Sequence, residues 1–189
     1  RRRVSATAWV LVAAGAVLFV LLASFVNVVI DRLPVQLDEP NEYGELWDTR
    51  PWSEVFGGRS RCSHCGEPVR AVDNVPVLSY LALRGRCRAC GEPYGSFHLW
   101  VELLVPLLAA GVTWGVVHHQ GWSWTLLPLL LLVPVGVAVS AIDLRTLIVP
   151  TRLIWPAVGL TAVLVVVAAL AEGQPRWILG AAIGVAALA

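Results

Sequence analysis

The chain has 189 residues, of which 57% are hydrophobic and only 14% are charged, and its formal net charge is +1. This composition is typical of a membrane protein, and the near-zero net charge argues against nucleic-acid binding. All 14 basic residues are arginine, no methionine occurs even at position 1, and the chain stops within an apolar run at Ala189. Because a natural reading frame begins with methionine, we expect this sequence to be a piece of a longer protein.

An apolar run from about Thr7 to Ile30 follows the N-terminal arginines and is long enough to cross a bilayer. It lacks the short apolar core and the small-residue cleavage site of a signal peptide, so residues 1–30 are predicted to be a retained transmembrane helix. Ser24 and Asn27 lie in its last turns. Polar side chains there either face a partner helix or are solvated near the helix end, and the sequence leaves both open.

Residues 31–97 form a polar domain with ten acidic residues and eight arginines. Residues 38–54 are acidic and rich in turn formers, and they are predicted to be a loop or insertion. Residues 72–81 hold enough apolar side chains to predict a small core. A domain of this size buries little surface, so we expect a bound metal ion to supply most of its stability.

The phrase Cys-x-x-Cys-Gly-Glu-Pro occurs twice, and its two copies hold all the cysteines of the chain. Two thiolates at this spacing can bind one tetrahedral ion, and the glycine after them permits a tight turn. We therefore predict a structural zinc ion held by Cys62, Cys65, Cys87 and Cys90. Two disulfides are an alternative that needs an oxidising compartment, and a redox site would not need the duplicate pair. His64, inside the first pair, is predicted to be an exposed polar residue.

Residues 98–189 are predicted to form a membrane domain, with spans at about residues 99–117, 122–142, 153–171 and 177–189. Glu102 either interacts favourably with the helix dipole or belongs to an inward-facing polar site. His118 and His119 are predicted to lie in a solvated turn, because adjacent histidines on a helix cannot both face one metal ion. The predicted fold class is an α-helical polytopic membrane protein with a small zinc-ribbon-like domain between its first two transmembrane helices.

The arginines in the connecting loops predict the topology. The loop after His119 has none, whereas the loop after the third span holds Arg145 and Arg152, which predicts that this loop and the zinc domain are cytoplasmic. A cytoplasmic position also agrees with the prediction that the cysteines are reduced and bind metal, because the cytoplasm is a reducing compartment. The same count puts the N-terminus outside with three arginines, against the positive-inside rule, and the residues offer no physical account of this.

Asp143 follows directly after about twenty apolar residues, so it is predicted to sit at the membrane edge. A carboxylate is costly there, which makes Asp143 a candidate functional residue. The alternative is an acid at a helix end, solvated by headgroup water and partnered by Arg145. The residues alone do not decide between the two.

Several motifs together resemble the bacterial prepilin peptidase family, the type IV leader peptidases, which are intramembrane aspartic proteases. The matching segments are residues 24–34, 62–65, 73–80, 83–90, 142–145 and 148–150. They cover the chain from about Ala23 to Leu153 in the order of the family. Ala23 stands where the family often has glycine, and Thr151 stands where an aspartate is common.

The resemblance implies a multi-pass enzyme of the bacterial inner membrane that cleaves the short basic leader of type IV pilins or type II pseudopilins at the cytoplasmic face. Members with the cysteine-bearing domain usually also methylate the new N-terminal amine with S-adenosylmethionine, although no glycine-rich cofactor loop is recognisable here. The first catalytic aspartate of the family matches Asp143. The second, in a Gly-x-Gly-Asp motif, has no match and is expected beyond Ala189.

An aspartic protease needs both carboxylates, because one activates water while its protonated partner polarises the peptide carbonyl. These 189 residues alone are therefore predicted to be inactive. One rival interpretation is a non-catalytic, membrane-anchored zinc-ribbon protein that binds or assembles partners, which gives Asp143 no role. Another is a degenerate family member that inserts and binds zinc without cleaving. The sequence does not predict which pilin is cleaved, which residues would hold S-adenosylmethionine, or the oligomeric state.

Overall fold

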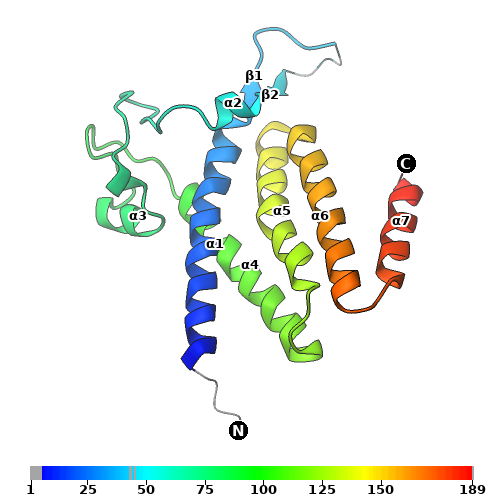
Figure 1. Ribbon diagram of the computed structural model, residues 1–189. Helices are drawn as coiled ribbons and strands as arrows, with labels where there is room; N and C mark the ends of the chain where they lie inside the picture. Colours follow the sequence, from blue (N-terminus) through cyan, green and yellow to red (C-terminus); the bar gives the residue numbers. More distant parts are fainter. Residues whose placement is uncertain (1–5, 43, 45, 189) are drawn as a thin grey trace. The chain divides into compact units, whose positions relative to one another are not determined.

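The computed structural model describes residues 6–42, 44 and 46–188, and the regular structure in this part of the chain is helical apart from one short pair of strands (Figure 1). It divides into two compact units, Arg1–Leu107 and Leu108–Ala189. Helix α4 (Phe97–Gln120) contributes to both units. The first unit thus combines the first long helix with the whole polar domain.

Among the described residues, four helices are long and apolar enough to cross a membrane. They are α1 (Ala6–Arg32), α4, α5 (Leu126–Thr146) and α6 (Thr151–Ala171). A shorter helix, α7 (Arg176–Leu188), follows α6. The predicted α-helical polytopic membrane fold, with a cysteine-bearing domain between the first two long helices, is confirmed.

Helix α5 begins and ends about four residues later than the predicted span at residues 122–142. At its start, the Ser123 hydroxyl and the Trp124 N–H both donate to a carboxylate oxygen of Glu172, which holds these residues in a turn before the helix. At its end, Leu147 has a φ of 56° and donates its N–H to the Asp143 carbonyl. Asp143 therefore lies in the last turn of α5 rather than after the helix.

Helix α4 runs through both histidines, so the predicted turn at His118 and His119 is wrong. The His118 ring stacks on Trp114, one turn earlier, with centroids 5.5 Å apart. Both histidine side chains are exposed, as predicted.

Residues 38–54, predicted to be a loop or insertion, contain regular structure. Strand β1 (Pro34–Gln36) pairs antiparallel with β2 (Trp47–Thr49), and the short helix α2 (Trp52–Val55) follows. The Arg50 N–H donates to the carbonyl of Leu33 at the end of α1, which fastens the hairpin to that helix. The side chain of Val55 is fully buried, so the segment covers the end of α1.

The first long helix buries one face of its last three turns. Ala23, Val26, Asn27 and Ile30 are each at most 6% exposed, and their spacing of three and four residues places them on one side of α1. Asn27 on this face contacts α4 through hydrogen bonds. The sequence left open whether the polar residues in the last turns of α1 face a partner helix or are solvated near the helix end. Asn27 faces a partner helix.

In the second unit, α6 packs against both α5 and α7. The buried residues of the long pair are mostly small: they include Ala138, Ala141, Ala157, Ala168 and Ala169. Small side chains let helix backbones approach closely, which is the main source of helix association in lipid. The leucines and valines of α5 and α6 are left largely on the outer faces, as expected for helices surrounded by acyl chains.

The cysteine segment, residues 60–96, has no comparable core. The 3-10 helix Ala71–Asn74 and the helix α3 (Leu78–Leu83) are both short. Val72, Leu78 and Leu81 are 62–68% exposed, so the prediction of a small apolar core at residues 72–81 is wrong. The two helices are too short to enclose these side chains, and the segment depends on other contacts for its shape.

Candidate metal centre and candidate catalytic aspartate

The two copies of the cysteine phrase fold into matching hairpins at residues 61–68 and 86–93. In the first hairpin the Cys62 N–H donates to the Glu67 carbonyl and the Gly66 N–H donates to the Cys62 carbonyl, both at 2.9 Å. The second hairpin repeats these two bonds at 2.8 and 2.9 Å, through Cys87, Glu92 and Gly91. The internal repeat of the sequence is therefore a repeat of structure.

A glycine and an arginine complete each hairpin. Gly66 and Gly91 have φ values of +73° and +75°, a left-handed conformation that side chains with a Cβ adopt only at a cost. Arg61 and Arg86, which precede the first cysteine of each pair, donate to the carbonyls of these glycines at 3.1 and 3.2 Å. Each arginine thus braces its own turn. The duplicated arginine was visible in the sequence, but its role was not predicted.

The hairpins bring the four thiols together. The Sγ atoms of Cys62, Cys65, Cys87 and Cys90 all lie within 4.8 Å of one another, and the Cys62–Cys90 distance is 3.9 Å. Four thiolates around a tetrahedral zinc ion, with Zn–S distances near 2.3 Å, would be about 3.8 Å apart. All four cysteines are free rather than paired as disulfides. The cluster can therefore hold a metal ion such as zinc, and His64 is exposed and is not a member of it.

The thiols of this cluster differ in pKa. Backbone N–H groups of Cys65 and His64 stabilise the Cys62 thiolate and lower its pKa to about 6. At Cys90 the Glu92 N–H acts in the same direction, but lost hydration and the neighbouring sulfur atoms outweigh it and raise the pKa to about 12. Four thiolates at this distance repel one another, so a bound cation is needed for all four to be ionised.

Contacts outside the hairpins hold the cysteine segment in shape. The Arg88 guanidinium donates to the Asp73 carboxylate at 2.6 Å and holds the pKa of that carboxyl below its usual range. Gly85, with a φ of +66°, lies so close to Tyr80 that a Cβ added there would come within 2.8 Å of the ring. The segment between the hairpins is thus held in place by the Asp73–Arg88 ion pair and by the close packing of the Gly85 backbone against the Tyr80 ring.

A polar cluster links the cysteine segment to the membrane helices. The Asn27 amide donates to the His98 carbonyl at 3.1 Å and to the Glu102 carboxylate at 3.4 Å. The other Glu102 oxygen accepts the Val77 N–H at 2.7 Å, and His98 Nε2 lies 2.6 Å from an Asp31 oxygen. Glu102 is not in the first turn of α4, so the inward-facing polar position, rather than the dipole contact, is the one observed.

The Val77 N–H that Glu102 holds belongs to a strained turn. Val77 has φ 60° and ψ −49°, and the Leu78 N–H donates to the Pro76 carbonyl at 2.5 Å, which together define a γ-turn with positive φ. A β-branched residue is rare in this conformation. The carboxylate of Glu102 thus stabilises a turn that the local sequence disfavours.

Asp143 lies in the last turn of α5 and its side chain is exposed, while its neighbour Ile142 is fully buried. The second unit has one other acid, Glu172, just after the far end of α6. The 21 residues of α6 span about 32 Å, so the two carboxylates are too far apart to act on one bond. The described part of the second unit therefore holds a single carboxylate at the Asp143 end.

Comparison with known proteins identifies similar sequences. Residues 17–116 match the family described as the Bacterial Peptidase A24 N-terminal domain. The Prepilin leader peptidase/N-methyltransferase of Stutzerimonas stutzeri is 36% identical over 148 residues, which are 74% of this chain and 50% of the relative. The proteins of the same name from Aeromonas hydrophila and Neisseria gonorrhoeae are 36% and 33% identical, over 72% and 77% of this chain and 48% and 52% of their own lengths. The chain spans about half the length of these curated relatives, and no solved structure matches it.

Proposed function

The chain belongs to the bacterial A24 peptidase family of prepilin leader peptidases, and we propose that it forms part of a membrane-embedded enzyme that removes the basic leader from type IV prepilins or type II pseudopilins. The observation that carries the proposal is the position of Asp143 in the last turn of a membrane-spanning helix. The relatives of the chain are named prepilin leader peptidases, which agrees with it. A carboxylate is energetically costly at such a place, so its presence there favours a functional role.

We propose that Asp143 is one member of a pair of catalytic aspartates. In such a pair one carboxylate activates a water molecule while the protonated partner donates a hydrogen bond to the scissile carbonyl. Glu172 is at the wrong end of α6 to be the partner, and it already accepts hydrogen bonds from Ser123 and Trp124. The partner is proposed to follow Ala189 in a longer protein, and without it the activity is expected to be absent.

A zinc ion at the four cysteines would have a structural role. Four protein ligands fill its tetrahedral shell and leave no open position for a substrate. The ion would hold the two hairpins together, and the Val77–Glu102 bond would connect the segment between them to α4. The zinc site thereby supports the first unit and takes no part in the hydrolysis.

The names of the relatives include an N-methyltransferase activity, and we include in the proposal the methylation of the new N-terminus with S-adenosylmethionine that the family resemblance implies. The arginines Arg145 and Arg152 favour a cytoplasmic position for the Asp143 end of α5, in the inner membrane of a bacterium. The acids of residues 31–97 would attract a basic leader only weakly, because arginines lie among them and salt screens the field.

The test is to replace Asp143 with Asn in the protein read from the whole gene and to coexpress it with a prepilin. Leader cleavage is expected to fall by at least ~10³-fold, because removing one member of a catalytic unit removes most of its effect. Asp38→Asn, an exposed acid of the polar domain, is the matched control and should cleave normally. Membrane insertion and zinc content should be unchanged in both variants.

Three results are distinguishable. Survival of cleavage in Asp143→Asn would reject the peptidase assignment and favour a non-catalytic zinc-ribbon protein that binds or assembles partners. If the unaltered protein inserts and binds zinc but cleaves nothing, a degenerate family member is the better description. Loss of cleavage in Asp143→Asn alone supports the proposal.

A further inference from the structure

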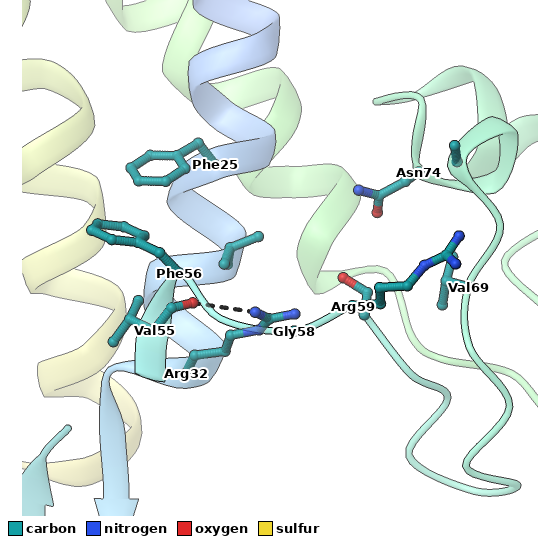
Figure 2. A pocket seen from close by; sticks show the side chains of 11 residues that line it. Phe25, Arg32, Val55, Phe56, Gly58, Arg59, Val69 and Asn74 are labelled. Carbon is teal, nitrogen blue, oxygen red and sulfur yellow. Dashed lines mark hydrogen bonds between the residues drawn. The ribbon is translucent and has the colours of Figure 1, made fainter. Parts of the chain in front are cut away.

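A cavity of about 400 Å³ lies beside the last two turns of α1 (Figure 2). Its walls come from α1, from α2 and the residues that follow it, and from the part of the cysteine segment on either side of the first hairpin. Figure 2 shows Phe25 and Phe56 on one side and Arg59 and Asn74 on the other, with Arg32 between them. The cavity thus has an apolar wall and a cationic wall.

The apolar wall is built from aromatic rings. Phe25 and Phe56 stack with centroids 5.6 Å apart, and Trp52 stacks on Phe56 at 5.1 Å. Phe25 and Phe56 are nevertheless 47% and 55% exposed, because the stack leaves their outer faces open. Phe25 belongs to the membrane-spanning part of α1, Gly15–Arg32, seven residues before its end. From the length and composition of this span, we expect the wall to lie near the boundary between acyl chains and headgroups.

The cationic wall carries two arginines, and no acidic residue lines the cavity. Arg32 donates from Nη1 to the carbonyls of Val55 and Gly57 at 3.2 and 2.7 Å, which fixes its guanidinium and leaves its other N–H groups available. Arg59 has no hydrogen bond or ion pair with the described part of the chain. Two arginines that line one cavity, with no acidic residue among its lining, favour an anionic ligand, and guanidinium groups match the geometry of phosphate.

We propose that this cavity binds an anionic phospholipid, with the phosphate at Arg32 and Arg59 and the glycerol and upper acyl chain against Phe25 and Phe56. A free inorganic anion would make no use of the aromatic wall, and a lipid without net charge would leave two arginines uncompensated. S-adenosylmethionine carries a net positive charge, so it matches a cavity lined by two arginines less well than an anionic lipid does. The proposal is independent of the peptidase assignment, since it uses none of the residues proposed for cleavage.

The test is lipid retention by the full chain, purified in a neutral detergent and mixed with equal amounts of phosphatidylglycerol and phosphatidylcholine. Native mass spectrometry should show preferential retention of phosphatidylglycerol. A basic residue near a membrane surface changes lipid affinity by about fivefold, so Arg59→Gln should reduce phosphatidylglycerol binding by about that factor. Arg50→Gln is the matched control, because Arg50 is exposed near the same end of α1 and does not line the cavity.

A second variant tests the space in the cavity independently of the charge of its arginines. Ala71 lines the cavity, and Ala71→Phe should reduce phosphatidylglycerol retention by filling the space while both arginines remain. Zinc content identifies any variant in which the fold has been lost. Equal retention of the two lipids, or equal losses in Arg59→Gln and Arg50→Gln, would reject a specific site. Complete displacement of phosphatidylglycerol by an equal concentration of inorganic phosphate would show a site for free anions and would also overturn the proposal.

Discussion

The cysteine segment and the α5–α6 pair use different means to hold a chain together. Of residues 60–96, all of which the structure describes, only Pro76 and Gly85 are buried. The segment is shaped by four clustered thiols, the Asp73–Arg88 ion pair and the Val77–Glu102 bond. In the α5–α6 pair the buried residues are mainly alanines at the contact between helices.

This difference predicts how each region responds to change. A segment held by a few polar contacts loses its shape when one of them is removed. A helical pair held by many small contacts in lipid loses only the part contributed by the altered group, because backbone hydrogen bonds within the helices remain satisfied. The following changes test this contrast.

Removal of the metal should have the largest effect. Structural zinc contributes an apparent ~10–16 kcal/mol to folding in small zinc domains, so a chelator should unfold the cysteine segment. The double variant Cys62→Ser and Cys87→Ser should bind no zinc by elemental analysis and should be cut by protease within residues 60–96. Protons compete with metal for thiolates, so release should increase as the pH falls through the pKa of about 6 at Cys62.

The second unit provides the control for this experiment, since residues 108–189 contain no cysteine. The helices of the second unit should remain protected from the protease by the detergent or bilayer after chelation. Unchanged zinc content and unchanged protease resistance in the double variant would contradict a structural metal site at these cysteines.

Gly85→Ala should have the next largest effect. The left-handed φ of +66° costs a residue with a Cβ ~1–2 kcal/mol, and the close contact with the Tyr80 ring adds ~1–3 kcal/mol of overpacking. Gly95→Ala is the matched control, because Gly95 has a φ of +74° and open space around it. Urea denaturation of the metal-bound protein measures both. Equal losses for the two variants would mean that the Tyr80 contact carries no energy.

The sequence predicted the elements that depend on local pattern and composition. The long apolar runs predicted the four long helices, and the duplicated Cys-x-x-Cys phrase led us to expect the four thiols to meet. Helix ends were less well predicted, since the ends of α5 depend on Glu172 and on the left-handed residue Leu147. These determinants are either distant in sequence or conformational, so apolar periodicity does not reveal them.

The polar cluster and the cavity could not be predicted because their residues meet only in the fold. Asn27 and Glu102 were each noted as polar residues in apolar spans, but they are 75 positions apart and nothing in either span pairs them. The γ-turn at Val77 contradicts the preference of a β-branched residue, so local propensity argued against it. Whether Asp143 is catalytic stays a prediction.

Glu102→Ala tests the link between the cysteine segment and α4. It leaves the Val77 N–H and one Asn27 donor without the carboxylate, and an unsatisfied buried donor costs ~1–3 kcal/mol. Glu102→Gln keeps an oxygen that can accept the Val77 N–H, so its loss of unfolding free energy should be about half as large. Urea denaturation measures both variants. A Glu102→Gln loss as large as that of Glu102→Ala would mean that the charge, rather than the hydrogen bond, stabilises the turn.

Glu172→Ala should have the smallest effect and tests the other side of the comparison. The Glu172 carboxylate accepts the Ser123 hydroxyl at 2.7 Å and the Trp124 N–H at 2.6 Å, so it fastens the start of α5 to the end of α6. Glu172 is half-buried, and water can replace it as the acceptor, so the cost should be about 1 kcal/mol or less, seen as a small fall in the Tm of the detergent-solubilised chain. Zinc content should not change. A loss equal to that of Glu102→Ala would mean that the α5–α6 pair also depends on single polar contacts, because packing of its alanines would then be insufficient to hold the two helices together.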